Sequence, residues 1–180
     1  MARKTKRSNF GFNVYLLSGL LLISIFSVWR YHQQRILSFN VSEVAKVNFS
    51  GVKPVHVKAY PVGVDVSIKD GVIKDGVWAI YPKDAVYLLG SAGLGDSGNT
   101  IIYGHNKDDV LGPIRWVKLG SIIEVLGSDG STYKYKVVKI DEVDPNNLSY
   151  IQPTKSEILT LYTCTGFLDS KRFIVVAERI

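Results

Sequence analysis

Cysteine is almost absent from this sequence, since the 180 residues contain only Cys164. A single cysteine excludes an intrachain disulfide, so this residue serves either packing or reactivity. The residues before it predict a strand, in which Leu159 and Leu161 share one face and Tyr162 lies on the other. Position alone favours packing, because free cysteines are among the most buried residues. However, a cysteine at a strand end is also held firmly beside a groove, as reactive residues usually are.

Histidine is scarce as well, with three in the chain. His105 ends the strand-like run Asn99–His105, and Arg172 opens the run Arg172–Ile180. Cys164, His105 and Arg172 therefore each stand at a border between strand and loop. A thiol nucleophile, a proton donor and acceptor, and a fixed positive charge are what acyl transfer by a thiol requires.

Acidic residues are missing from residues 1–35, which carry six of the 22 basic residues. The other 16 basic residues balance the 16 acidic ones in residues 36–180. The basic pI therefore belongs to the N-terminal segment. It is no evidence for nucleic-acid binding, which requires a basic patch on the folded domain.

Charge is also absent from the 20 residues Phe10–Trp29, which are long enough to cross a bilayer as a helix. A cleaved signal peptide is the alternative, but this run ends in Trp29 beside Arg30, which is typical of an interfacial anchor. The greater positive charge before the run predicts a cytoplasmic N-terminus. We expect a cytoplasmic tail (1–9), a transmembrane helix (10–29), an extracellular stalk (30–51) and a folded domain (52–180).

The folded domain is predicted to be mainly β. Two dipeptides, Asp70-Gly71 and Asp75-Gly76, are hairpin signals. The segment Ala85–Leu89 after a proline turn predicts a turn or a short helix. Alternating residues predict a clear hairpin with arms Ser121–Leu126 and Thr132–Asp141. His56 falls on the more polar face of an opening strand and is predicted to be a surface histidine.

Motifs for a nucleotide or a metal are lacking. The glycine-rich loop Gly90–Gly98 has neither the lysine nor the following helix of a phosphate-binding loop. Asp108 and Asp109 have no metal-binding pattern around them, so we expect no cofactor and no metal. Pro113 predicts a single helical turn. The loop Asp144–Ser156 precedes the cysteine strand, and long loops beside a reactive residue often shape substrate binding.

Three stretches carry a resemblance to a known family. Thr160–Cys164 resembles the TLxTC signature of sortases, the membrane-anchored cysteine transpeptidases of bacterial cell surfaces. Gly98–His105 is similar to the strand that leads to the family's histidine, and Lys171–Ala177 to the strand that carries its arginine. The order of these stretches and the spacing between them match those of the family across Val52–Ile180. The resemblance implies a closed eight-stranded β-barrel with short helices.

The resemblance also implies an activity. Sortases cleave a C-terminal sorting signal of the LPxTG kind and transfer the protein to an amine of the cell wall or of a pilin lysine. By resemblance Cys164 forms the thioester, His105 transfers protons and Arg172 stabilises the oxyanion. Thr163 and the loop Asp144–Ser156 are expected to bind the sorting peptide. The small number of residues between Cys164 and Arg172 in the sequence is similar to that in class D, E or F sortases.

Two alternatives stay open from the residues alone. One is another thiol enzyme, either a peptidase or an L,D-transpeptidase, although the Ser-His-Gly-Cys pattern of the latter is missing around Cys164. The other is a non-catalytic β domain tethered to the membrane, with Cys164 buried. The second alternative predicts that Cys164 resists alkylation in the folded domain.

Overall fold

The computed structural model describes residues 10–34, 36–40 and 51–180. The chain forms two compact units, Met1–Gln34 and Arg35–Ile180. The expected cytoplasmic tail and most of the expected stalk, residues 41–50, lie outside the described residues.

The first unit contains helix α1, Phe10–Gln34. It begins where the uncharged run begins and continues five residues past Trp29. An 18-residue window, Val14–Tyr31, is long and apolar enough to cross a membrane, with a mean hydropathy of 1.6. The hydroxyl groups of Ser24 and Ser27 donate to backbone carbonyls four residues earlier, at 2.9 and 2.7 Å. These polar side chains are thereby satisfied within the helix, as a hydrocarbon environment requires.

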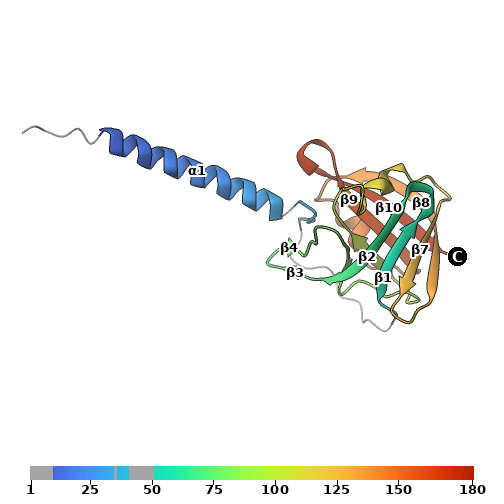
Figure 1. Cartoon of the computed structure of the whole chain (residues 1–180). Helices are drawn as coiled ribbons and strands as arrows, with labels where there is room; N and C mark the ends of the chain where they lie inside the picture. Colours follow the sequence, from blue (N-terminus) through green and yellow to red (C-terminus); the bar gives the residue numbers. More distant parts are fainter. Residues whose placement is uncertain (1–9, 35, 41–50) are drawn as a thin grey trace, which may run out of the picture. The chain divides into compact units, whose positions relative to one another are not determined.

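The second unit is a closed barrel of eight strands, in the spatial order β1-β2-β5-β6-β9-β10-β8-β7, with β7 pairing back to β1 (Figure 1). Neighbouring strands are antiparallel except for the pairs β2–β5 and β6–β9, which are parallel. The barrel strands are β1 (Pro54–Ala59), β2 (Val64–Gly71), β5 (Ala85–Leu88), β6 (Asn99–Tyr103), β7 (Ile122–Gly127), β8 (Thr132–Val143), β9 (Ile158–Thr165) and β10 (Lys171–Arg179).

Short elements lie outside the barrel wall. The strands β3 (Ile73–Lys74) and β4 (Val77–Trp78) form a separate two-stranded sheet. Four 3₁₀ turns occur in the described residues: η1 (Tyr60–Val62), η2 (Gly112–Trp116), η3 (Leu148–Ile151) and η4 (Phe167–Asp169).

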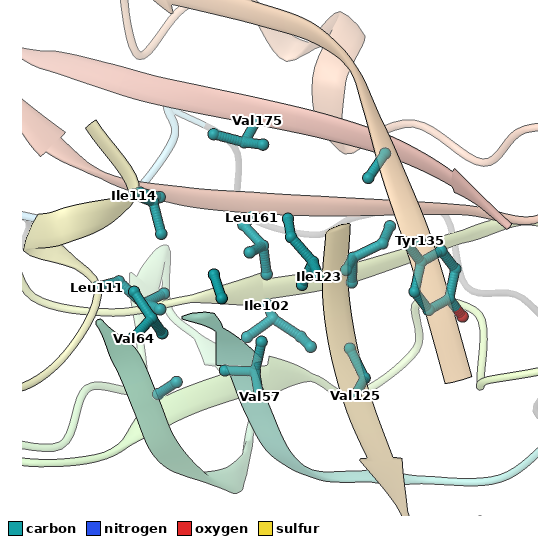
Figure 2. Close-up of a cluster of buried hydrophobic side chains, with 14 of the residues drawn as sticks. Val57, Val64, Ile102, Leu111, Ile114, Ile123, Val125, Tyr135, Leu161 and Val175 are labelled. Carbon is teal, nitrogen blue, oxygen red and sulfur yellow. The ribbon is translucent and has the colours of Figure 1, made fainter. Parts of the chain in front are cut away.

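One face of every strand fills the barrel interior. Figure 2 shows apolar side chains converging there from the barrel strands and from the segment at η2. The labelled residues are Val57, Val64, Ile102, Leu111, Ile114, Ile123, Val125, Tyr135, Leu161 and Val175. Side chains alternate across a strand, so the strand residues next to these inward-facing ones lie on the outer face of the barrel.

Part of the outer face carries a second apolar layer. These buried residues, here called the outer cluster, come from five barrel strands and from segments that cover them. The members are Leu37, Phe39, Trp78, Val86, Leu88, Ile101, Tyr103, Val143, Ile151, Tyr162, Cys164 and Ile174. Cys164 therefore lies outside the barrel interior but still within an apolar layer.

The structure corrects two local expectations. Asp70-Gly71 is not a hairpin turn, since both residues continue strand β2 and pair with β5. The segment predicted as a turn or short helix, Ala85–Leu89, contains strand β5, all four residues of which are buried. Pairing with β2 and β6 outweighs the local helix signal, because valine and tyrosine pack well in a buried strand.

Other local expectations are confirmed. Asp75 and Gly76 both have positive φ angles, 53° and 71°, and join β3 to β4. This is the backbone geometry that a two-residue hairpin requires. Strands β7 and β8 form the predicted hairpin, and η2 supplies the helical turn expected at Pro113.

Candidate active site

Cys164 occupies the end of β9, on the outer face of the barrel wall. The predicted alternation is confirmed, because Leu159 and Leu161 point into the barrel interior while Tyr162 and Cys164 belong to the outer cluster. Only 2% of Cys164 is exposed. The residue is therefore held rigidly by the sheet and is covered in this arrangement.

Arg172 lies directly opposite Cys164. The two residues are register partners on the antiparallel strands β9 and β10. Opposed residues in such a pair point to the same face, with Cβ atoms about 4.5–5.5 Å apart. The guanidinium Nη1 donates to the carbonyls of Asp169 and Lys171, at 2.9 and 3.0 Å, which fixes its direction. The thiol and a positive charge thus share one small area of the outer face.

His105 follows the end of β6, the strand that runs parallel to β9. The register Tyr103↔Tyr162 places the end of β6 beside the end of β9. The backbone N–H of Gly104 donates to the Tyr162 carbonyl at 3.2 Å, which extends this pairing by one residue. The structure therefore brings the predicted histidine, cysteine and arginine to the same end of three adjacent strands.

Thr163 lies on β9 next to Cys164. Its side chain is fully buried, and its hydroxyl donates to the Gly104 carbonyl at 2.8 Å. Neighbouring residues of a strand face opposite sides, so Thr163 points away from the face that carries Cys164. Its hydroxyl thus joins the cysteine strand to the residue before His105, and contact of Thr163 with the sorting peptide stays a prediction.

Burial has the largest effect on the protonation states of Cys164 and His105. It raises the pKa of the Cys164 thiol to about 12. The positive charge of Arg172 has the opposite effect on this pKa but is the smaller of the two. Burial also lowers the pKa of His105; the charge of Lys107 adds to this effect, and that of Asp169 opposes it. Thiol and imidazole are therefore both neutral near pH 7 in this arrangement, and the thiol must be uncovered before it can ionise readily.

The segment Ile36–Asn40, here called the cover segment, lies over this site. It falls within the predicted stalk, yet it belongs to the same compact unit as the barrel. The Cys164 thiol donates to the Ile36 carbonyl, with Sγ and O 2.7 Å apart. Leu37 and Phe39 are 1% and 0% exposed. Two large apolar residues separated by one serine were the available signal for a buried extended segment.

The loop Asp144–Ser156 borders the same region. Its 3₁₀ turn η3 places Ile151 in the outer cluster. The backbone N–H of Asn40 donates to the Pro145 carbonyl at 3.0 Å, so the cover segment and this loop are in contact. This position agrees with a loop that borders a peptide groove, and substrate contact stays a prediction.

His56 is remote from these residues. It lies on β1, is partly exposed and pairs with Asp65 of β2. The two residues help to line a surface hollow together with Lys58 and Glu124. Strands β5 and β6 separate β2 from β9 in the barrel. Among the described residues, no group of three potential metal-ligating side chains comes together.

Comparisons with known proteins agree on one family. The family model described as the Sortase domain matches residues 57–180. Sortase A of Listeria monocytogenes is 34% identical over 85 residues, which is 45% of this chain and 38% of the Listeria protein. This match therefore spans well under half of the length of that relative.

Solved structures show the same fold. Sortase C2 from pilus island 1 of Group B Streptococcus has 27% identity and a TM-score of 0.62, over 87% of this chain and 94% of that chain. A lid mutant of sortase A from Corynebacterium diphtheriae has 24% identity and a TM-score of 0.61, over 71% of this chain and 69% of that chain. The second likeness concerns the fold alone.

Proposed function

The chain belongs to the sortase family, and from this premise we propose that it is a membrane-anchored cysteine transpeptidase acting on C-terminal LPxTG-like sorting signals. The observation that carries the proposal is the direct opposition of Cys164 and Arg172 on β9 and β10, with His105 at the end of the adjacent strand β6. Three strands thus bring together the groups that thiol-based acyl transfer requires.

In the first half-reaction the Cys164 thiol, once uncovered, passes its proton to His105, and its thiolate sulfur adds to the carbonyl carbon of the threonine of the signal. The guanidinium of Arg172 stabilises the negative oxygen that results. In support of this role, its Nη2 already donates to a peptide carbonyl, that of Ser38, at 2.7 Å. The bond from threonine to glycine then breaks, His105 gives its proton to the departing amine, and a thioester to Cys164 remains.

In the second half-reaction an amine attacks the thioester carbonyl. Neutral His105 takes a proton from this amine, the carbon–sulfur bond breaks and Cys164 leaves as the thiolate. The acceptor is an amine of the cell wall or of a pilin lysine. The name of the streptococcal sortase C2 refers to a pilus island, which supports a pilin among the candidates.

The apolar helix fits a membrane anchor for such an enzyme. We propose that residues 10–29 span the bilayer, with the basic tail in the cytoplasm and the barrel outside the cell. Secreted proteins carrying a sorting signal would then meet the active site at the cell surface. Membership in class D, E or F stays a prediction from the compact ending after Cys164.

The test is peptide cleavage by the full chain in detergent micelles, with a panel of LPxTG-like peptides and an added amine, followed by product masses. We expect an amine-ligated product from the wild type and none from Cys164→Ala. Since an oxyanion-stabilising or proton-transferring group contributes about 100-fold or more, His105→Ala and Arg172→Lys should lose at least that factor. Leu119→Ala is the matched control, because Leu119 is 66% exposed.

One observation favours a second candidate, a non-catalytic domain with a structural thiol: Cys164 is 2% exposed. This candidate predicts that no peptide in the panel is cleaved and that His105→Ala has no effect on thiol reactivity. Cleavage that depends on Cys164 and His105 would exclude it.

A further inference from the structure

The loop Gly166–Ser170 joins the strand that carries the nucleophile to the strand that carries the arginine. Strand β9 ends at Thr165 and strand β10 begins at Lys171. The 3₁₀ turn η4, Phe167–Asp169, lies within this loop. No step of the proposed reaction uses the loop, although it connects two of the three functional groups.

Two residues of this loop have a left-handed backbone conformation without being glycine. The φ angles are 51° at Leu168 and 58° at Asp169. Such conformations are unfavourable and persist where the surrounding structure holds them. The N–H of Asp169 donates to the Gly166 carbonyl at 3.3 Å, and the N–H of Ser170 donates to the Phe167 carbonyl at 3.2 Å. The position of Asp169 is therefore set by the backbone of a closed turn.

Asp169 binds the site directly. Its carbonyl accepts from Nη1 of Arg172 at 2.9 Å, and Arg172 is the register partner of Cys164. Asp169 is partly buried, whereas its neighbours Phe167 and Leu168 are 84% and 67% exposed. A partly buried charge is screened less by solvent and salt than an exposed one. The Asp169 carboxylate therefore adds a negative charge next to the thiol and the guanidinium.

This carboxylate acts on both proton-transferring groups in the same direction. Burial lowers the pKa of His105 and Lys107 adds to this effect, whereas the Asp169 carboxylate raises the same pKa. Burial raises the pKa of Cys164 and Arg172 opposes this effect, whereas the Asp169 carboxylate adds to the rise. A nearby negative charge favours the protonated form of each group.

We propose that Asp169 is a positioning residue whose carboxylate sets the pH range of the reaction by favouring the protonated forms of His105 and Cys164. The proposal rests on the proposed function for the reaction, but both effects can be measured without substrate. In the first step of the proposed reaction the thiol gives its proton to neutral His105. Activity is therefore lost at low pH, where His105 is already protonated, and at high pH, where the thiol has already ionised.

Asp169→Asn tests the role of the charge. Asparagine keeps the size of the side chain and tolerates the left-handed conformation. We expect the acid limb of kcat/KM against pH to move to lower pH than in the wild type, because the pKa of His105 falls when the carboxylate is removed. The assay is cleavage of an LPxTG-like peptide by the full chain in detergent micelles.

Asp75→Asn is the matched control. Asp75 also has a left-handed φ angle, 53°, but it lies in the exposed turn between β3 and β4. In the described part of the chain, Asp75 is not among the charged residues that act on His105 or Cys164. This variant loses the same charge from the same backbone conformation and should keep the acid limb of the wild type.

A titration without substrate separates loss of charge from loosening of the loop. NMR of the imidazole signals in the full chain reports the pKa of His105, with His105→Ala to assign the signal. Loss of charge should lower this pKa. A loosened loop that uncovers His105 would raise it, because burial is what lowers it. The two causes therefore have opposite signs.

Asp169→Gly is the second variant, because glycine adopts the left-handed conformation without strain and removes the same charge. It should lower the pKa of His105 as Asp169→Asn does. In both variants iodoacetamide should alkylate Cys164, the only cysteine, faster than in the wild type at a fixed, mildly alkaline pH, since a larger fraction of the thiol is ionised.

The outcomes distinguish failure of the inference from failure of the proposed function. An unchanged or raised pKa of His105 in both Asp169→Asn and Asp169→Gly would overturn the proposal. A lowered pKa of His105 with no cleavage of any sorting peptide would contradict the transpeptidase function and support the effect of Asp169 on the two groups. Cleavage with the acid limb at its wild-type pH in both variants would overturn the proposal alone.

Discussion

Cys164 is the residue whose chemistry depends most on its surroundings. Burial in the outer cluster raises its pKa to about 12, whereas an unperturbed cysteine titrates near about 8.5. In this arrangement the thiolate is disfavoured, because the thiol lies among apolar side chains. The midpoint of the alkylation rate against pH in the wild type should therefore lie above the ordinary cysteine value.

The cover segment affects this midpoint, because its side chains help to bury Cys164. Phe39→Ala removes a fully buried ring from the cluster that contains Cys164, so the alkylation midpoint should fall towards about 8.5. The measurement is the alkylation rate of both proteins from mildly acidic to strongly alkaline pH, within the range in which each stays folded. Identical midpoints for the wild type and Phe39→Ala would contradict a coupling between covering and ionisation.

Individual residues differed in how far the sequence could predict them. Cys164, His105 and Arg172 could be predicted because each stands at the border of an apolar run, where a strand begins or ends. For Thr163, contact with the sorting peptide stays a prediction. Its orientation follows from strand alternation, which sends it to the face opposite Cys164.

At the scale of elements, the loop between β6 and η2 sets the position of His105. The His105 carbonyl accepts from the N–H groups of Lys107 and Leu111, at 2.9 and 3.2 Å. Gly112 packs against this turn so closely that a Cβ atom there would lie 2.7 Å from the Lys107 carbonyl oxygen. The neighbour is backbone and cannot move aside as a flexible side chain could.

Gly112→Ala should therefore displace the histidine loop. We expect kcat/KM to fall about 10- to 100-fold, since small misplacements of a catalytic group have effects of that size. The thermal midpoint should also fall. The assay is peptide cleavage together with thermal unfolding of the same preparation.

Gly130→Ala provides the matched control. Gly130 has a φ angle of 83° in the β7–β8 turn, and a Cβ atom added there would have no neighbouring atom within 4 Å. Alanine at this position should cost about 1 kcal/mol in stability through backbone strain alone and leave kcat/KM unchanged. A Gly112→Ala enzyme that loses stability but keeps full kcat/KM would show that the loop does not position His105.

Elements with a strong local signal were predictable, and those decided by distant contacts were not. The β7–β8 hairpin has alternating faces and a short glycine-containing turn, which are local features. Strand β5 was missed because its identity depends on pairing with β2 and β6. The cover segment was missed because the surface that buries Leu37 and Phe39 is built from residues far along the chain.

At the scale of the whole molecule, closure of the barrel depends on long-range pairing. Strand β7 returns to β1, with Val57 opposite Val125. Alternation in each strand fixes which face turns inward, but it does not name the partner strand. The family resemblance supplied the number of strands, and the structure supplies their order and register.

The same barrel connects fold to activity, because the residues after β6, the end of β9 and the start of β10 carry the three proposed functional groups at one end of three adjacent strands. No local property of the sequence brings those strands together. The order of these strands brings three residues that are far apart in the sequence to one site. The cover segment contacts Cys164 and Arg172 at this site.

The most direct test of this account is the intact mass of the full chain after incubation with an LPxTG-like peptide and no amine. We predict an added mass equal to the acyl fragment ending in threonine in the wild type, and no adduct in Cys164→Ala. Added amine should remove the adduct and release the ligated product. The absence of an adduct in the wild type, across the peptide panel, would contradict the assignment of Cys164 as a transpeptidase nucleophile.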